Sequence, residues 1–114
     1  MAFSREVRDI GSRRVEILYP LHEIDSYNGE EMKTFIENTD GFDAVIINFS
    51  RVNYLNSSGL RELIQLLKHL KSMGKSLFLT HLSDEIQKIF NSTNLHRLFN
   101  ICKNEEENCL FPEG

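Results

Sequence analysis

Two short apolar runs stand out along the chain. Residues 43–49 (DAVIINF) and 77–80 (LFLT) are almost continuously hydrophobic, which is typical of parallel strands that are buried on both faces. Between these runs, apolar residues recur at helical spacing, at Leu60, Leu63, Ile64, Leu67 and Leu70. This stripe predicts an amphipathic helix over about residues 57–73 that lies on the sheet.

The first twenty residues have a weaker pattern. Apolar and polar residues alternate loosely over residues 3–10 and again over 15–19, with Gly11 and Ser12 between them. Two short strands joined by a turn are therefore predicted. Pro20 is expected to end the second strand, because proline cannot donate a sheet hydrogen bond.

Helix-capping signals predict further helices. Asn28, with Glu31 three residues later, resembles a capping box, so a first helix is predicted to begin there and to end near Asn38. Ser83, which is followed by two acidic residues, predicts the N-terminus of a third helix. The acidic run 104–108 is expected to start a short, frayed terminal helix.

The alternation of strands and helices after residue 20 implies right-handed βαβ connections, so the predicted fold class is α/β with a mixed, mostly parallel sheet. The helix stripes predict a layer of helices over one face of that sheet. The weak alternation in the N-terminal strands would leave the other face partly open. Ligand sites in such sheets favour the loops at the carboxyl ends of strands.

Composition argues against several classes of function. The net charge of −4 argues against a nucleic-acid binder, which usually carries clustered positive charge. The histidines lie in separate segments, and Cys102 and Cys109 do not form a CxxC pair, so no metal or other cofactor is expected. There is no signal-peptide pattern and no stretch that approaches a membrane span. We therefore expect a cytoplasmic protein whose two thiols are reduced.

The segment 54–60 (YLNSSGL) lies where the chain passes into the helix of residues 57–73. Asn56, Ser57 and Ser58 are residue types that cap helix N-termini, so one of them is expected to be the cap. A phosphate there would be stabilised by exposed N–H groups and by the helix dipole. Phosphorylation would thus add up to about two negative charges without melting the helix. The alternative is a plain junction whose serines only cap.

This segment, together with the preceding strand, the striped helix, Gly74 and the following strand, resembles the STAS domain family. The resemblance covers residues from about 5 to 110 and implies a single domain over residues 1–114. Soluble members of the family are bacterial anti-sigma factor antagonists, which regulate transcription by partner switching. The family motif is Asp-Ser/Thr-Ser/Thr-Gly-Leu. Its first hydroxyl residue, which corresponds to Ser57, is phosphorylated by an anti-sigma factor that is also a protein kinase.

The resemblance also implies roles for individual residues. The expected partner-binding residues are Asn56, Ser57, Ser58, Gly59 and Leu60. Ser57 would accept the phosphate, Ser58 would support the loop, and Gly59 would permit a close approach of a partner or of neighbouring backbone. The implied partners are a serine-kinase anti-sigma factor and a serine phosphatase, with no nucleic acid and no membrane.

One departure from the motif leaves alternatives open, because Asn56 replaces the family aspartate. If that carboxylate orients or activates the hydroxyl, the chain is instead a STAS binding or scaffold module that is not phosphorylated. A third hypothesis makes Ser57 a catalytic nucleophile with a histidine as its base. The nucleophile-elbow sequence is absent, because Leu55 and Asn56 stand where its first glycine would be needed, and we do not expect an enzyme.

Overall fold

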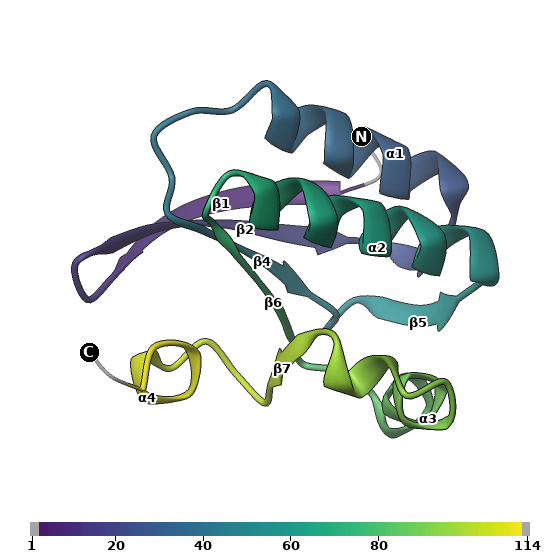
Figure 1. Cartoon of the computed structure of the whole chain (residues 1–114). Helices are drawn as coiled ribbons and strands as arrows, with labels where there is room; N and C mark the ends of the chain where they lie inside the picture. Colours follow the sequence, from purple (N-terminus) through teal and green to yellow (C-terminus); the bar gives the residue numbers. More distant parts are fainter. Residues whose placement is uncertain (1–2, 113–114) are drawn as a thin grey trace.

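The computed structural model describes residues 3–112 (Figure 1). Its elements, in chain order, are β1 (Phe3–Ile10), β2 (Arg13–Pro20), β3 (His22–Ile24), α1 (Ser26–Glu37), β4 (Ala44–Asn48), β5 (Val52–Leu55), α2 (Ser57–Ser72), β6 (Ser76–Thr80), α3 (Asp84–Ser92), the 3₁₀ helix η1 (Leu95–Arg97), β7 (Asn100–Cys102) and α4 (Glu107–Leu110). The predicted α/β class is confirmed.

The main sheet has the strand order β1-β2-β4-β6-β7. β1 and β2 form the predicted antiparallel hairpin, and every other neighbouring pair in this sheet is parallel. The two apolar runs form β4 and β6, which lie side by side near the centre of the sheet. A mixed, mostly parallel sheet is therefore confirmed.

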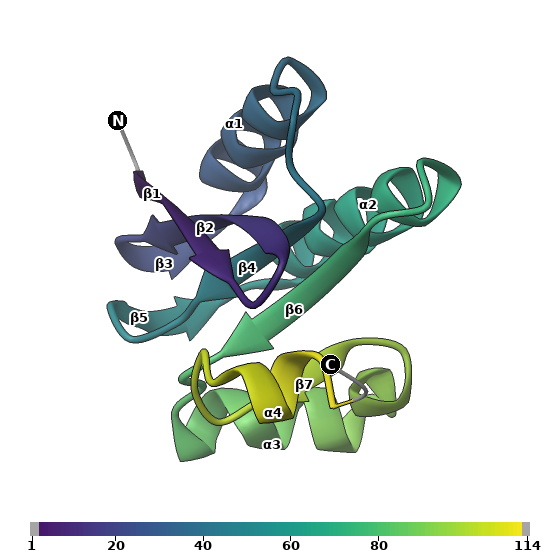
Figure 2. The ribbon, with the colours of Figure 1, turned by 90° about the vertical axis from the view of Figure 1, so that its left-hand side faces the viewer.

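Helices α1 and α2 lie next to each other over one face of the sheet (Figures 1 and 2). Alternate strand residues reach this layer, and they share one hydrophobic cluster with the inward faces of α1, α2 and α3. Its fully buried members include Leu18, Ile36, Ile47, Leu70, Leu79 and Phe90. The layer of helices predicted from the apolar stripes is thus confirmed.

The opposite face of the sheet is less open than expected. Leu110 and Phe111, at the end of α4, pack against a second buried cluster whose strand residues are Ile10, Val15, Ile17, Ala44, Ile46 and Phe78. Figure 1 shows α4 on the side of the sheet that faces away from α1 and α2. Sequence analysis predicted a short terminal helix but not this cover, because a helix of only four residues has too few positions to show an apolar face.

A second, two-stranded parallel sheet pairs β3 with β5. Sequence analysis predicted neither strand. They have three and four residues and are interrupted by a register shift next to His22, whose φ is +67°. Each strand leads directly into a helix, β3 into α1 and β5 into α2. This small sheet therefore fixes the relative positions of the two helix N-termini.

Within residues 3–112, none of the helices combines the length and the apolar character needed to cross a membrane.

Candidate functional site

The N-terminus of α2 is capped by Asn56. Its backbone is extended, with φ −95° and ψ 171°, and its side-chain Oδ1 accepts a hydrogen bond from the Gly59 N–H at 2.8 Å. The Asn56 carbonyl accepts from the Leu60 N–H at 3.0 Å, which closes the first turn of the helix. Of the three residues expected to compete for the cap, Asn56 is the one that occupies it.

The two serines that follow have different environments. The Ser58 hydroxyl is half-buried and donates a hydrogen bond to Asn56 Oδ1 at 2.9 Å, as expected of a residue that supports the loop. Ser57 is exposed at the first position of α2. The structure thus presents Ser57 to solvent and ties Ser58 to the cap, so Ser57 carries the more accessible of the two hydroxyl groups.

Gly59 marks a close contact between α2 and the end of β3. A Cβ atom added there would lie 2.1 Å from the Ile24 carbonyl oxygen and 2.5 Å from its carbon. The Asn56 N–H donates to the same Ile24 oxygen at 3.3 Å. The close approach at Gly59 is therefore to neighbouring backbone. It holds the start of α2 against the strand that leads into α1.

The N-terminus of α1 lies three residues earlier than predicted. Asp25 is its cap, and Asp25 Oδ1 accepts from the N–H groups of Tyr27 and Asn28 at 2.9 and 3.0 Å. Asn28 Oδ1 accepts from the Asp25 N–H at 2.9 Å, which completes a capping box. The prediction of Asn28 as the cap was wrong because Asn28 takes the reciprocal role that Glu or Gln usually fills.

The two helix starts form one surface at the same end of the fold, because β3 and β5 are parallel and Ile24 pairs in register with Leu55. Two aromatic side chains are exposed at this end. Tyr27, in the first turn of α1, is 80% exposed, and Tyr54, in β5, is 57% exposed. We call Tyr27, Tyr54, Asn56 and Ser57 the cap surface. Sequence analysis gave neither tyrosine a role, although Tyr54 lies within the segment 54–60 and was a usable signal.

Leu60 is half-buried and packs against the main hydrophobic cluster, while Gly59 is buried. Of the five residues predicted to contact a partner, only Ser57 is exposed. The set of five stays a prediction. The structure indicates that Gly59 and Leu60 act by shaping the turn, because their positions are largely covered by the protein itself.

Two of the four histidines, His81 and His96, make polar contacts away from Ser57. His81 Nδ1 lies 2.8 Å from Glu105 Oε2, and His96 Nδ1 lies 3.3 Å from the Phe90 carbonyl oxygen. Over residues 3–112, no hydrogen bond joins Ser57 to a histidine, and no group of three or more His, Cys, Asp or Glu residues is placed to hold a metal ion. The geometry gives no support to Ser57 as an activated nucleophile.

Glu105 anchors the C-terminal segment to the carboxyl ends of β4 and β6. Its side chain is 10% exposed, and Oε2 accepts hydrogen bonds from Asn48 Nδ2 and Thr80 Oγ1, each at 2.9 Å. Arg8 of β1 lies 3.6 Å from the other carboxylate oxygen. The carboxylate thus joins three parts of the chain, and it sets where the segment leading to α4 crosses the sheet.

Comparison with known proteins agrees with this arrangement. The STAS domain family matches residues 8–108. The anti-sigma-B factor antagonist of Listeria monocytogenes is 28% identical over 108 residues, which is 93% of each chain. The protein of the same name from Staphylococcus aureus is 29% identical over 86 residues, or 74% of this chain and 80% of the relative.

Solved structures share the fold. A Thermotoga maritima protein superimposes with a TM-score of 0.77 at 23% identity, over 90% of this chain and 87% of its own. The phosphorylated form of the Bacillus cell fate determinant SpoIIAA gives a TM-score of 0.66 at 18% identity, over 94% of this chain and 96% of its own. Because the family match spans nearly the whole chain, this protein belongs to the STAS domain family.

Proposed function

We propose that this protein is an anti-sigma factor antagonist, a non-enzymatic cytoplasmic regulator of transcription that binds a kinase-type anti-sigma factor through the cap surface and is released when Ser57 is phosphorylated. The observation that carries the proposal is the difference between the environments of Ser57 and Ser58. Ser57 is exposed at the start of α2, whereas the Ser58 hydroxyl is engaged by Asn56. Two relatives named anti-sigma-B factor antagonist support the same function.

The position of Ser57 allows phosphorylation to change binding without unfolding the protein. A phosphate at the first turn of α2 would lie beside backbone N–H groups and the positive end of the helix dipole. It would add up to about two negative charges to an exposed surface. A partner that packs closely on that surface would then have to desolvate the dianion, which weakens the complex.

Asn56 keeps the structural role that an aspartate would have at the cap, because its Oδ1 atom is the acceptor for both Gly59 and Ser58. What the replacement removes is the negative charge of a carboxylate on the residue directly before Ser57. The folded loop therefore remains suited to a kinase partner. The rate of phosphoryl transfer is the property that Asn56 would change.

A second candidate function is a STAS binding module that is not phosphorylated, and Asn56 is the feature that favours it. Immobilised wild type, Ser57→Ala and Ser57→Asp would be incubated with lysate of the native organism, and captured proteins identified by mass spectrometry. Ser12→Asp is the matched control, since Ser12 is exposed in the β1–β2 turn at the opposite end of the sheet (Figure 1).

The antagonist proposal expects wild type, Ser57→Ala and Ser12→Asp to retain an anti-sigma factor with a kinase domain, and Ser57→Asp to lose it. Equal capture of one partner by all four baits would instead support the unphosphorylated module. Retention by Ser57→Asp together with loss by Ser12→Asp would place the partner surface elsewhere and overturn the cap surface as the contact.

A further inference from the structure

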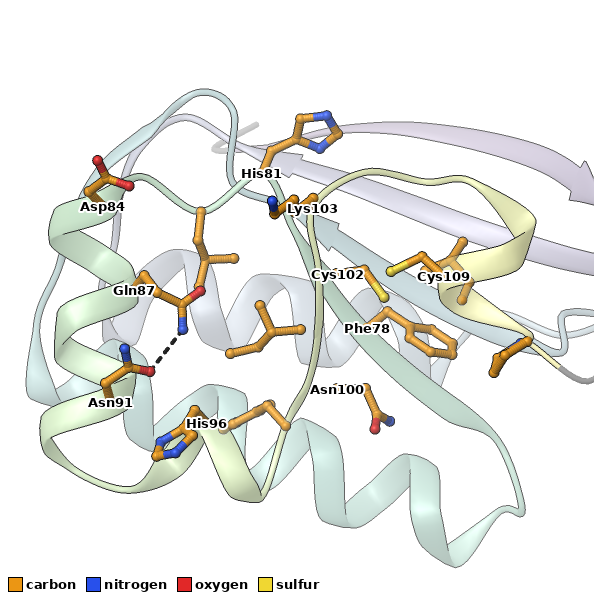
Figure 3. Close-up of a pocket in the computed structure, with 15 residues that line it drawn as sticks. Phe78, His81, Asp84, Gln87, Asn91, His96, Asn100, Cys102, Lys103 and Cys109 are labelled. Carbon is orange, nitrogen blue, oxygen red and sulfur yellow. Dashed lines mark hydrogen bonds between the residues drawn. The ribbon is translucent and has the colours of Figure 1, made fainter.

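The two cysteines lie together in a cleft of about 920 Å³ between α3, β7 and α4. Cys102 is on β7 and Cys109 is on α4, and both are free thiols that line this cleft. In Figure 3 the two side chains point toward each other across the gap between strand and helix. The chain reverses over residues 103–106, which brings these sulfur atoms together.

The two thiols are unequal in their accessibility. Cys109 is exposed and Cys102 is half-buried. Burial, together with the neighbouring Cys109 thiol, raises the pKa of Cys102 to about 12. Because the thiolate is the reactive form of cysteine, Cys102 is a poor first nucleophile at neutral pH. An oxidant from solvent should therefore react first at Cys109.

We propose that Cys102 and Cys109 are a redox modification site, in which a peroxide converts the two thiols into a reversible intramolecular disulfide. First, the Cys109 thiolate attacks one oxygen of hydrogen peroxide. An S–O bond forms, the O–O bond breaks and hydroxide leaves, so Cys109 becomes a sulfenic acid. The Cys102 sulfur then displaces the hydroxyl group of the sulfenic acid. The S–S bond forms, the S–O bond breaks, and the Cys102 proton leaves with the hydroxyl group as water.

The net reaction consumes one hydrogen peroxide and two thiols and yields one disulfide and two waters. Two electrons pass from the sulfur atoms to the peroxide. Thiol–disulfide exchange with a dithiol reductant reverses the change, because the exposed Cys109 sulfur gives the reductant access to the bond.

The disulfide would fix the position of the residues that cover the second hydrophobic cluster. Leu110 and Phe111 follow Cys109 directly and are buried against the face of the sheet that α1 and α2 do not cover. The Phe111 ring packs edge-on to Phe78, with centroids 5.3 Å apart, and the Arg13 guanidinium lies 4.1 Å from the Phe111 centroid. A covalent link from α4 to β7 would hold these side chains in place, so oxidation would restrict opening of the C-terminal segment.

The test uses the purified full chain, reduced and then exposed to hydrogen peroxide, with Cys102→Ser and Cys109→Ser as matched variants. In the wild type we expect a mass loss of about 2 Da, a cross-linked peptide containing residues 102 and 109, and a rise in Tm of about 5 °C that dithiothreitol reverses. Cys102→Ser should accumulate a sulfenic acid at Cys109, trapped by dimedone. Cys109→Ser should be oxidised by hydrogen peroxide at about one tenth of the rate of Cys102→Ser, or more slowly still.

Three results would overturn the proposal. The first is a wild-type protein that gains oxygen without a cross-link. The second is a disulfide that joins separate chains in place of one chain. The third is a Cys109→Ser variant that is oxidised as fast as Cys102→Ser. None of these readouts involves a partner protein, so the result is independent of the proposed antagonist function.

Discussion

The Oδ1 atom of Asn56 accepts the hydroxyl hydrogen of Ser58 at 2.9 Å. The same oxygen accepts the Gly59 N–H and so caps α2. One side-chain atom therefore organises the first turn of the helix and withdraws one of two adjacent hydroxyl groups from solvent. The other hydroxyl, on Ser57, is exposed.

Two substitutions separate the capping role of residue 56 from the effect of a negative charge at that position. Asn56→Ala removes the acceptor and should lower the free energy of unfolding by about 1 kcal/mol, while Asn56→Asp keeps the acceptor and should leave it within about 0.5 kcal/mol of wild type. Urea unfolding followed by circular dichroism measures both values. If the proposed kinase partner is in hand, Asn56→Asp should also be phosphorylated faster at Ser57. An Asn56→Ala variant as stable as wild type would argue against the cap.

Gly59→Ala should be strongly destabilising, because the added Cβ would meet the Ile24 carbonyl oxygen at 2.1 Å. Backbone atoms cannot rotate away as a side chain can, so we expect a loss of about 3 kcal/mol in the free energy of unfolding. Gly41→Ala is the control. Gly41 has open space around it and a φ of +81°, so its substitution should cost only the strain of a left-handed residue, about 1 kcal/mol. Equal losses in chemical denaturation would show that the contact with β3 is unimportant.

The elements that could be predicted from sequence are those whose signal is local. The β4 and β6 runs are almost continuously hydrophobic, which identifies buried strands, and the long apolar stripe of α2 identifies an amphipathic helix. The motif at residues 54–60 could be placed at the start of α2 for the same reason. The role of each of its residues could only be assigned once the hydrogen bonds of Asn56 were known.

The elements that were missed depend on contacts between distant residues. β3 and β5 are stabilised as strands by pairing with each other, and Ile24 is 31 positions from its partner Leu55. No periodicity develops in strands of three and four residues. The burial of Phe111 likewise depends on the chain reversing after β7, which the composition of residues 103–106 does not dictate.

Phe111→Ala tests whether the C-terminal segment belongs to the folded core. Phe111 is 9% exposed and packs on Phe78, so truncation should lower the free energy of unfolding by about 3 kcal/mol. Leu98→Ala is a suitable control, because Leu98 is 41% exposed and should cost less than about 0.5 kcal/mol. Guanidinium unfolding curves of the two variants give the comparison. A Phe111→Ala protein that unfolds at the wild-type midpoint would mean that α4 contributes nothing to the cover.

The hairpin carries an acidic group whose contribution to stability depends on pH. The Tyr19 hydroxyl donates to Glu6 Oε1 at 2.6 Å, and Arg8 donates to the same carboxylate at 2.9 to 3.1 Å. The hydrogen bond from Tyr19, followed by that from Arg8, lowers the pKa of Glu6 below its ordinary value of 4.5. Folding therefore favours the ionised carboxylate.

Because the folded pKa of Glu6 is the lower one, its stabilising effect is present above the unfolded pKa and is lost as the pH falls through the folded pKa. Glu6→Gln should be less stable than wild type at pH 7, and the difference in Tm should shrink as the pH falls below about 4.5. Tyr19→Phe should reduce the same pH dependence without removing it, since Arg8 remains. Thermal unfolding at pH 7, 5, 4 and 3 would show this convergence, and a Glu6→Gln difference that stays constant over that range would exclude the carboxylate as its source.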